Sequence, residues 1–152
     1  MKSKPPKIHL DPQPILREVA EPFDIDNSRA DRISLSNRLQ MFLPGSGGYA
    51  VAAPQIGISK AAFVYRVEDA SGVVFNPTIV DYSDELWSFH EGCLSIPGKY
   101  WEIQRPRYVT VEGYNTKGEE LHFELEDLLA RVFQHEIDHL LGILCKDHVD
   151  GE

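Results

Sequence analysis

The 152 residues match the size of one ordinary domain, so we expect residues 1–152 to fold as a single unit. Hydrophobic residues make up 42% of the chain and charged residues 26%, which is typical of a globular protein with its own core. The net charge of −9 argues against a nucleic-acid groove, which needs a basic face, and against docking on an anionic membrane.

The chain has only two cysteines, Cys93 and Cys145, too few for a disulfide framework. The first residues lack the apolar segment of a signal peptide, and no apolar run has the length of a membrane span. These features predict a protein of the cytoplasm.

The first half of the chain predicts an extended arm, one helix and a loop. Residues 11–28 are rich in proline and predict the arm, with one short turn. Residues 31–43 predict a helix, because their leucines and phenylalanine share one face, and Pro44 and Gly45 would end it. The glycine-rich stretch 45–59 contains apolar residues and a glutamine, which favour a tight loop against a core over a flexible linker.

The middle of the chain predicts strands. Runs of β-branched and aromatic residues at 61–67, 73–80 and 107–114 are typical of strands. The alternating run at 119–125 should pair with the strand before it across Asn115–Gly118.

The last predicted helix runs from about Asp127 to Leu141, and Gly142 is a plausible stop. On a helical wheel, one polar face contains Asp127, Arg131, Gln134 and Asp138. His135, Glu136 and His139 fall on the broad apolar side, which a helix normally buries. We therefore expect these three side chains to point into the protein. Strands around one buried helix predict an α+β fold.

The segment QHEIDHL at 134–140 contains a metal-binding pattern. His135 and His139 are one helical turn apart, so both rings can reach one ion. Glu136 is rotated off that line and can act as a general base on a water at the ion without binding the metal itself. The alternative is a pair of buried histidines satisfied by hydrogen bonds, but a full HExxH on the core side of a helix favours the metal.

A catalytic site of this kind needs a third protein ligand and one open position. The candidates are Cys93, Cys145, His148, His90, Asp147 and Asp150. Cys145 completes the spacing HExxHxxGxxC, in which metzincin proteases have histidine at the last position, but it can also be a small buried apolar residue. Cys93 lies in HEGCLSIPG, where Gly92 leaves room for a close backbone approach. By chemistry alone the two cysteines have comparable claims. A thiolate with two imidazoles suits Fe(II), Zn, Co or Ni better than Mg or Ca.

Three stretches together resemble peptide deformylase: GYAVAAPQIG (48–57), EGCLS (91–95) and QHEIDHL (134–140), in the order of that family. PQPILREVA and VVFNPTIV are also similar to it, so the resemblance covers nearly the whole chain. The resemblance implies a hydrolase with antiparallel β-sheets around the helix that carries HExxH. It would remove the formyl group from the N-terminal formyl-methionine of new peptides and release formate.

The resemblance also implies a role for each matching residue. Cys93, His135 and His139 would hold one divalent metal ion, Fe(II) in most members, with Zn, Ni or Co also accepted. Glu136 would transfer the proton, while the Gln55 side chain and the backbone N–H of Leu94 would donate to the oxyanion. Tyr49, Ala50 and Gly92 would flank the substrate main chain. Arg105 and Asp138 would form a charge cluster with Glu91, although a solvated surface pair is an equally good interpretation.

Several residues depart from the family pattern. Ala50 stands where glycine is usual, so its methyl group is expected to narrow the groove, and Tyr49 replaces a small aliphatic residue. Tyr100 stands where a longer polar residue is common, and Arg131 where an aliphatic pocket residue is common. The short end after His139 resembles the deformylases of some bacterial viruses, which implies a host-cell cytosol and no ribosome docking by a C-terminal helix.

We expect a monomer whose partner is a formyl-methionyl peptide. Two other hypotheses remain open at this point. One is a metalloprotease that uses Cys145 as third ligand, and the other is an inactive binding protein whose fourth position is closed by His90 or His148.

Overall fold

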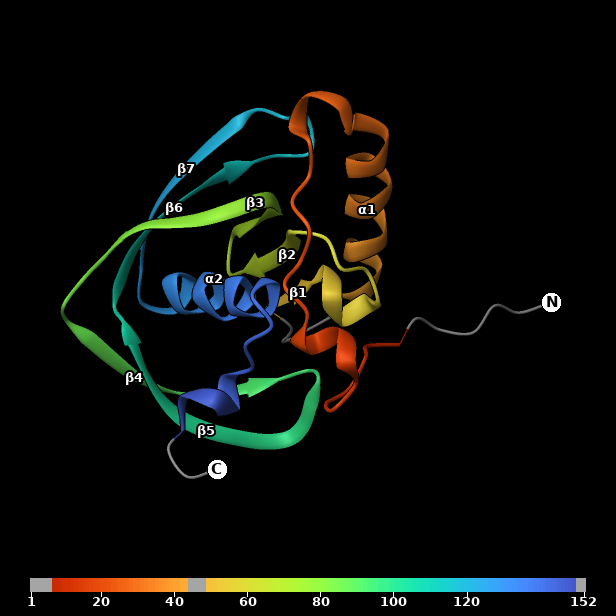
Figure 1. The fold of residues 1–152 in the computed structure, drawn as a ribbon. Helices are drawn as coiled ribbons and strands as arrows, with labels where there is room; N and C mark the ends of the chain where they lie inside the picture. Colours follow the sequence, from red (N-terminus) through yellow and green to blue (C-terminus); the bar gives the residue numbers. More distant parts are fainter. Residues whose placement is uncertain (1–6, 44–48, 150–152) are drawn as a thin grey trace.

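A five-stranded antiparallel sheet separates the two α-helices in the computed structural model, which describes residues 7–43 and 49–149 (Figure 1). The strand order is β1-β2-β3-β6-β7, with bounds Ala50–Ala52, Ala62–Val67, Ala70–Tyr82, Tyr108–Tyr114 and Glu120–Glu126. Strands β4 (Leu86–Cys93) and β5 (Ile96–Pro106) form a separate antiparallel hairpin. The helices are α1 (Arg29–Phe42) and α2 (Asp127–Leu140).

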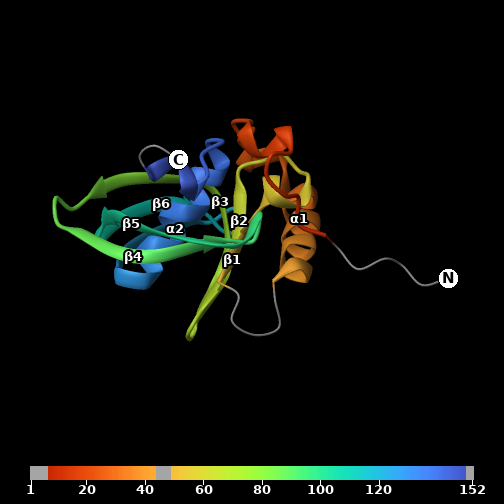
Figure 2. The ribbon, with the colours of Figure 1, turned by 90° about the horizontal axis from the view of Figure 1, so that it is seen from below.

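Alternation of side chains along β1 and β2 places the two helices on opposite faces of this sheet. Val51 and Val64 belong to the core cluster that contains Leu35 and Leu39 of α1. Their neighbours Ala52 and Phe63 belong to the cluster that contains Phe133 and Ile137 of α2. Because successive residues of a strand point to opposite faces, both faces of β1 and β2 are buried. Figure 2 shows α1 and α2 on either side of these strands.

Helix α2 ends in the turn that its sequence predicts. Gly142 has φ +77, its N–H donates to His139 O, and the N–H of Ile143 donates to Asp138 O. These two hydrogen bonds form a Schellman motif, which satisfies carbonyl groups left over at a helix end. A Cβ on Gly142 would lie 2.5 Å from Arg17 O, so the N-terminal segment packs directly against this turn.

Most predicted elements are confirmed, with small shifts of their ends. The α+β fold with antiparallel sheets around α2 is confirmed, and β6 pairs with β7 as expected. The arm has 3-10 turns at Pro14–Arg17 and Ile25–Asn27 instead of one turn. The predicted loop at 45–59 instead contains β1 and a 3-10 helix at Ala53–Ile56, while residues 45–48 and the predicted helix stop at Pro44 and Gly45 lie outside the described residues.

The polar face that the helical wheel shows on α2 is not solvated at Arg131 and Gln134, which are 3% and 6% exposed. The β4–β5 hairpin covers this part of the helix and supplies partners for both side chains. Arg131 donates to Glu91 and to Trp87 O of β4, and Gln134 donates to Pro106 O of β5. Strands β4 and β5 were not predicted. The sequence therefore suggested no hydrogen-bond partner for the side chains of Arg131 and Gln134.

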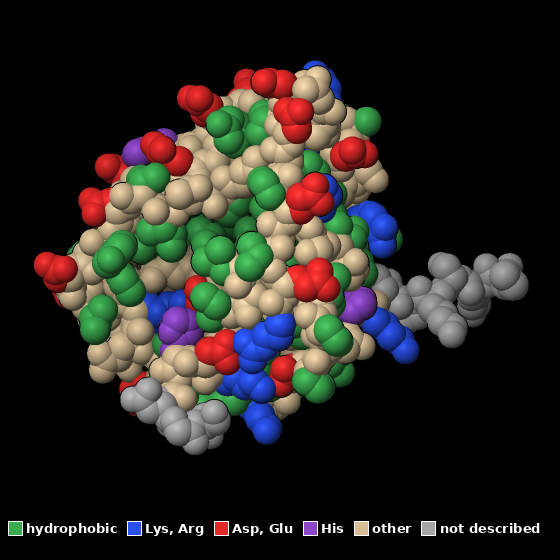
Figure 3. Space-filling view, viewed as in Figure 1, with side chains coloured by type: hydrophobic (Ala, Val, Ile, Leu, Met, Phe, Trp, Pro, Cys, Tyr) green, Lys and Arg blue, Asp and Glu red, His purple; other side chains and the backbone are tan. Residues whose placement is uncertain are grey.

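Acidic side chains spread along the outer edge of the face drawn in Figure 3, in agreement with the net charge of −9. None of the helices in the described part of the chain is both long enough and apolar enough to cross a membrane.

Candidate metal centre and active site

Three side chains that can bind a metal converge from two elements. Cys93 is the last residue of β4, while His135 and His139 lie one turn apart on α2. One ligand atom from each lies within 4.8 Å of the others, and Cys93 Sγ is 3.4 Å from His139 Nε2. Bond lengths at a tetrahedral ion place a thiolate sulfur and an imidazole nitrogen about 3.5 Å apart, so this spacing fits one ion.

The ring nitrogens of the two histidines are suited to metal binding. His135 Nδ1 donates to Glu91 Oε1 at 2.9 Å, because a carboxylate can only accept, and this leaves Nε2 for an ion. Burial lowers the pKa of His139 well below its ordinary value, and the charge of His135 adds to this, so the ring is neutral. For His135, burial acts in the same direction, but hydrogen bonds with Cys93 and Glu91 raise its pKa to about 10. An ion at His135 must displace that proton.

Cys145 also lies close to His135. It forms a second possible group with Glu91 and His135, whereas the group that contains both histidines has Cys93. Among the described residues, Cys145 therefore does not join both histidines at this spacing. Its thiol is 2% exposed, and burial raises its pKa to about 12. Neither possible group contains His90 or His148, and His148 Nε2 instead contacts Asp138 Oδ2 at 2.8 Å.

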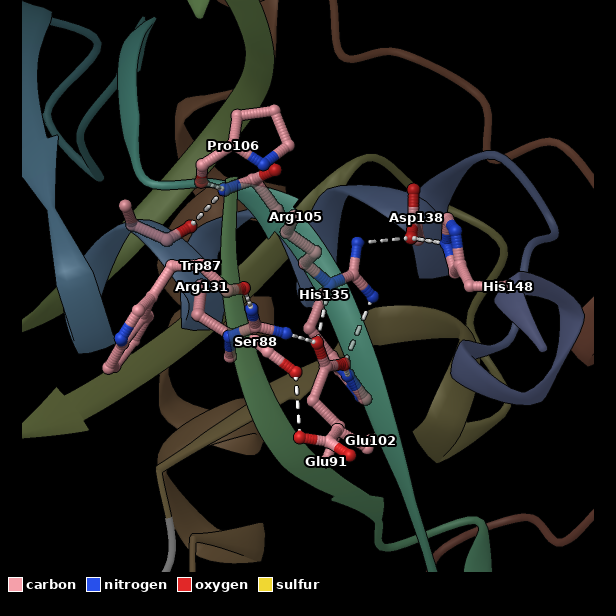
Figure 4. A network of polar contacts seen from close by, with 12 residues as sticks. Trp87, Ser88, Glu91, Glu102, Arg105, Pro106, Arg131, His135, Asp138 and His148 are labelled. Atoms are coloured by element: carbon pink, nitrogen blue, oxygen red, sulfur yellow. Dashed lines mark hydrogen bonds and ion pairs between the residues drawn. The ribbon is translucent and has the colours of Figure 1, made fainter. Parts of the chain in front are cut away.

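Glu91 is the centre of a buried network of charges behind His135 (Figure 4). Its carboxylate accepts hydrogen bonds from Nε and Nη2 of Arg105, from Nη1 of Arg131 and from His135. Arg105 also donates to Asp138, so the cluster expected from the family is present. Arg105 is 4% exposed, which rejects the alternative of a solvated surface pair.

The electrostatics of this network keep Glu91 ionised. Burial alone favours the neutral acid, but hydrogen bonds from His135 and Arg105 hold the pKa of Glu91 far below its ordinary value of 4.5. An ionised Glu91 accepts from Nδ1 of His135 and so fixes both the orientation and the tautomer of this ring.

Glu136 is a buried carboxylate with an unused oxygen. It is 4% exposed, and its Oε1 has no hydrogen-bond partner among the described residues. Burial is the main cause that raises the pKa of Glu136 to about 7, since His135 opposes the shift and Glu91 adds to it. A carboxylate with such a pKa can accept and return a proton near neutral pH.

Gln55 and Leu94 lie beside Cys93. Gln55, in the 3-10 helix Ala53–Ile56, is 1% exposed, and its Nε2 is 3.9 Å from Cys93 Sγ. Leu94 and Ser95 form the two-residue turn between β4 and β5. Ser95 was not singled out by the sequence, yet it is 1% exposed and accepts a hydrogen bond from Gln55 Nε2 at 3.1 Å. Its position at the end of the EGCLS motif was the sequence signal that could have identified it.

A cavity of about 540 Å³ opens onto these groups. Its lining contains all but one of the residues to which the resemblance gives a metal-binding, catalytic or main-chain-binding role, the exception being His139: Tyr49, Ala50, Gln55, Gly92, Cys93, Leu94, His135 and Glu136. A Cβ on Gly92 would lie 2.5 Å from the Tyr100 ring, so the close approach predicted at Gly92 is made by a side chain instead of backbone. Arg131, Leu128 and Phe89 also line the cavity.

Comparison with known proteins gives one consistent result. The sequence profile of the polypeptide deformylase family matches residues 5–152. A peptide deformylase of Carboxydothermus hydrogenoformans is 44% identical over 138 residues, which are 91% of this chain and 89% of that protein.

Solved structures are similar over nearly their whole length. The crystal structure of peptide deformylase from Thermotoga maritima has a TM-score of 0.89 and 36% identity, and covers 97% of this chain and 99% of that one. A probable peptide deformylase from Synechococcus phage S-SSM7 has a TM-score of 0.86 and 35% identity, and covers 94% of this chain and 99% of that one.

Proposed function

The chain belongs to the polypeptide deformylase family of enzymes, and from this we propose that it hydrolyses the formamide at the N-terminus of formyl-methionyl peptides and releases formate. One observation carries the proposal. A buried carboxylate, a buried carboxamide and two members of a Cys-His-His set with metal-ligand spacing, Cys93 and His135, line one cavity. Water would add to the formyl carbon, the carbon–nitrogen bond would break, and the free amine would leave with a proton.

Cys93, His135 and His139 would hold one divalent ion, and their thiolate and imidazole donors favour Fe(II), with Zn, Ni or Co as substitutes. When bound, the ion would supply Lewis acidity towards water and the formyl oxygen. Glu91 would orient His135 for this task through the hydrogen bond to Nδ1.

Glu136 would be the general base and then the general acid. Its side chain lies in the cavity lining next to His135, and its Oε1 is free to accept a proton from the attacking water. The pKa near 7 allows the same group to deliver that proton to the leaving amine. Loss of such a group typically lowers the rate by about 10²–10⁴-fold.

Gln55 and the backbone N–H of Leu94 would donate to the oxygen that becomes negatively charged. Both residues line the cavity beside Cys93. One preorganised donor of this kind is typically worth about 3–4 kcal/mol of the barrier. Tyr49, Ala50 and Gly92 would flank the main chain of the peptide, because they lie in or next to strands that border the same cavity.

We propose action as a monomer in the cytoplasm, on peptide ends and without docking to nucleic acid or membrane. Two observations support this proposal. The net charge of −9 disfavours binding to RNA and to anionic lipid. Both cysteines are free, and a thiolate ligand needs a compartment in which it stays reduced.

The test is formate release from a formyl-Met peptide by protein purified without oxygen and loaded with Fe(II). Glu136→Ala should lose turnover by about 10²–10⁴-fold while its metal content stays unchanged. The matched control is Glu120→Ala, which removes an exposed carboxylate from β7 and should retain full activity. Unchanged turnover in Glu136→Ala would reject this role. Cleavage of unformylated peptide bonds would favour a protease instead.

A further inference from the structure

Ser95 connects Gln55 to the N-terminal segment around His9, and it does not face the cavity. Its hydroxyl accepts from Gln55 Nε2 at 3.1 Å and donates to the carbonyl of His9 at 2.7 Å. Ser95 is 1% exposed and is not among the residues that line the cavity. The proposed mechanism gives this buried hydroxyl no task.

Hydrogen bonds join Ala52 to Gln55, Gln55 to Ser95, and Ser95 to His9. The backbone groups at the two ends of this row determine the direction of every bond in it. The N–H of Ala52 can only donate, so it must face Oε1 of Gln55, which it does at 2.9 Å. The carbonyl of His9 can only accept, so the Ser95 hydroxyl must spend its proton there and can only accept from Gln55. The carboxamide of Gln55 therefore cannot flip without the loss of two buried hydrogen bonds.

The second N–H of Gln55 has no oxygen or nitrogen acceptor among the described residues and makes only a long contact with the Cys93 sulfur. Nε2 carries two protons, and Ser95 takes one of them. Nε2 also lies 3.9 Å from Cys93 Sγ, so the amide borders the metal ligands. A carboxamide held in this way presents its second donor to the side where the substrate oxygen would bind.

The N-terminal segment holds both partners together through its backbone. The N–H of His9 donates to Gln55 O at 2.7 Å, and the N–H of Asp11 donates to Ser95 O at 2.9 Å. A Cβ on Gly57 would lie 2.8 Å from His9 Nε2, so the segment packs closely against the Gln55 loop. Lys146 binds Asp11 at 2.6 Å and anchors the segment from the C-terminal side.

We propose that Ser95 is a positioning residue for the reaction. Held by the carbonyl of His9, its hydroxyl fixes the carboxamide of Gln55 so that the second N–H of Nε2 is aimed at the oxyanion. Ser95 itself does not touch the substrate. This inference rests on the proposed function, because the oxyanion belongs to the deformylation step.

A double-mutant cycle with Ser95→Ala and Gln55→Ala tests the proposal. Loss of an oxyanion donor costs about 10²–10³-fold in kcat, and we expect Ser95→Ala to show a smaller loss in kcat with KM unchanged. In the Gln55→Ala background, Ser95→Ala should have no further effect on kcat. Equal losses in both backgrounds would overturn the proposal, because Ser95 would then act independently of Gln55.

Two controls separate positioning from folding. Ser88→Ala removes a hydroxyl that binds Glu102 on the exposed side of the same hairpin, and it should leave kcat unchanged. Metal content and thermal unfolding show whether Ser95→Ala is folded. If it is not, the cycle is run with Ser95→Cys, which keeps the volume of the side chain but bonds weakly. A loss of kcat that disappears in the Gln55→Ala background would again support the proposal, and equal losses in both backgrounds would again overturn it.

A measurement without turnover separates this inference from the proposed function. The side-chain amide protons of Gln55, assigned by their loss in Gln55→Ala, should exchange slowly with solvent in the native protein and faster in Ser95→Ala. Slow exchange in both proteins would overturn the proposal even if formate is released. The expected change in a protein that releases no formate would reject only the proposed function.

Discussion

Arg131 on α2 donates a hydrogen bond to the carboxylate of Glu91, 40 positions earlier in the chain on β4. The same carboxylate holds Arg105 and the ring of His135, so one acidic group accepts from three basic side chains. Arg131 also lies near the Trp87 and Phe89 rings, 5.5 and 5.6 Å from their centroids. An arginine that lines the cavity is therefore part of the support behind His135.

The two arginines should contribute unequally to stability. Arg105→Met leaves Asp138 and Glu91 without their main partner, and loss of one member of a buried pair costs about 3–5 kcal/mol. Arg131→Met leaves Glu91 with Arg105 and His135, and also removes a buried Nε that has no partner among the described residues. We expect a smaller loss there, about 1.5–3 kcal/mol at most. Urea unfolding of metal-free protein measures both, and equal losses would contradict this ranking.

Glu91 should make stability depend on pH in acid. Its folded pKa lies far below the ordinary value of 4.5, so its contribution is complete above about pH 4.5 and is lost as pH falls towards the folded pKa. Wild-type protein should therefore lose about 2 kcal/mol more unfolding free energy between pH 5 and pH 3 than Glu91→Gln does. Both proteins are measured without metal, so that acid release of the ion does not contribute. Parallel curves would contradict the assignment.

The two cysteines should differ in their effect on metal binding. Cys93→Ala should lose the ion, because Cys93 is the thiol that joins both histidines. Cys145→Ala should keep it, since Cys145 is a buried thiol whose pKa is raised to about 12. Metal analysis after dialysis measures both variants. If Cys145→Ala lost the metal and Cys93→Ala kept it, the third ligand would be Cys145, as in the metalloprotease hypothesis.

Alkylation gives an independent comparison for Cys145. A protonated, buried thiol reacts slowly, so iodoacetamide should modify Cys145 only after unfolding. Mass spectrometry of native and urea-treated Cys93→Ala protein shows this directly. Rapid labelling of the native variant would show that Cys145 is exposed.

Gly142→Ala should destabilise the end of α2. Gly98 is a matched control, because φ is +77 at Gly142 and +79 at Gly98, but a Cβ on Gly98 meets nothing within 4 Å. The left-handed conformation alone costs about 1–2 kcal/mol, which is the loss expected for Gly98→Ala. Gly142→Ala should lose clearly more, because its Cβ would lie 2.5 Å from Arg17 O. Equal losses in urea unfolding would show that the N-terminal segment moves aside.

Local patterns predicted the elements whose partners are close in sequence. The 3.6-residue period of 127–141 predicted α2 and the burial of His139 and Glu136, both confirmed. The alternation at 119–125 predicted the pairing of β7 with β6, whose register runs from Tyr108 with Glu126 to Tyr114 with Glu120. Such contacts depend on neighbours in the chain, so the sequence contains most of the information that determines them.

The errors came from contacts that are distant in sequence. Arg131 and Gln134 belong to a polar face by the helical wheel, yet β4 and β5 cover them and supply acceptors. The hairpin itself was not predicted, although it holds Cys93, Glu91 and Ser95. Most of its side chains are exposed or half-buried, so no fully buried face imposes an alternating apolar pattern on the sequence.

The sequence by itself determined the donor set, the helix that carries two of its members and the family to which the chain belongs. Residue chemistry and helical spacing are local properties, so they can be derived from the order of amino acids. The family resemblance already implied Cys93 as the third ligand, and the tertiary structure groups Cys93, and not Cys145, with both histidines. Only the tertiary structure decided that Arg131 binds Glu91 and that Ser95 holds Gln55. Each of these depends on how the β4–β5 hairpin packs against α2 and the N-terminal segment, where chain separation gives no guide to distance.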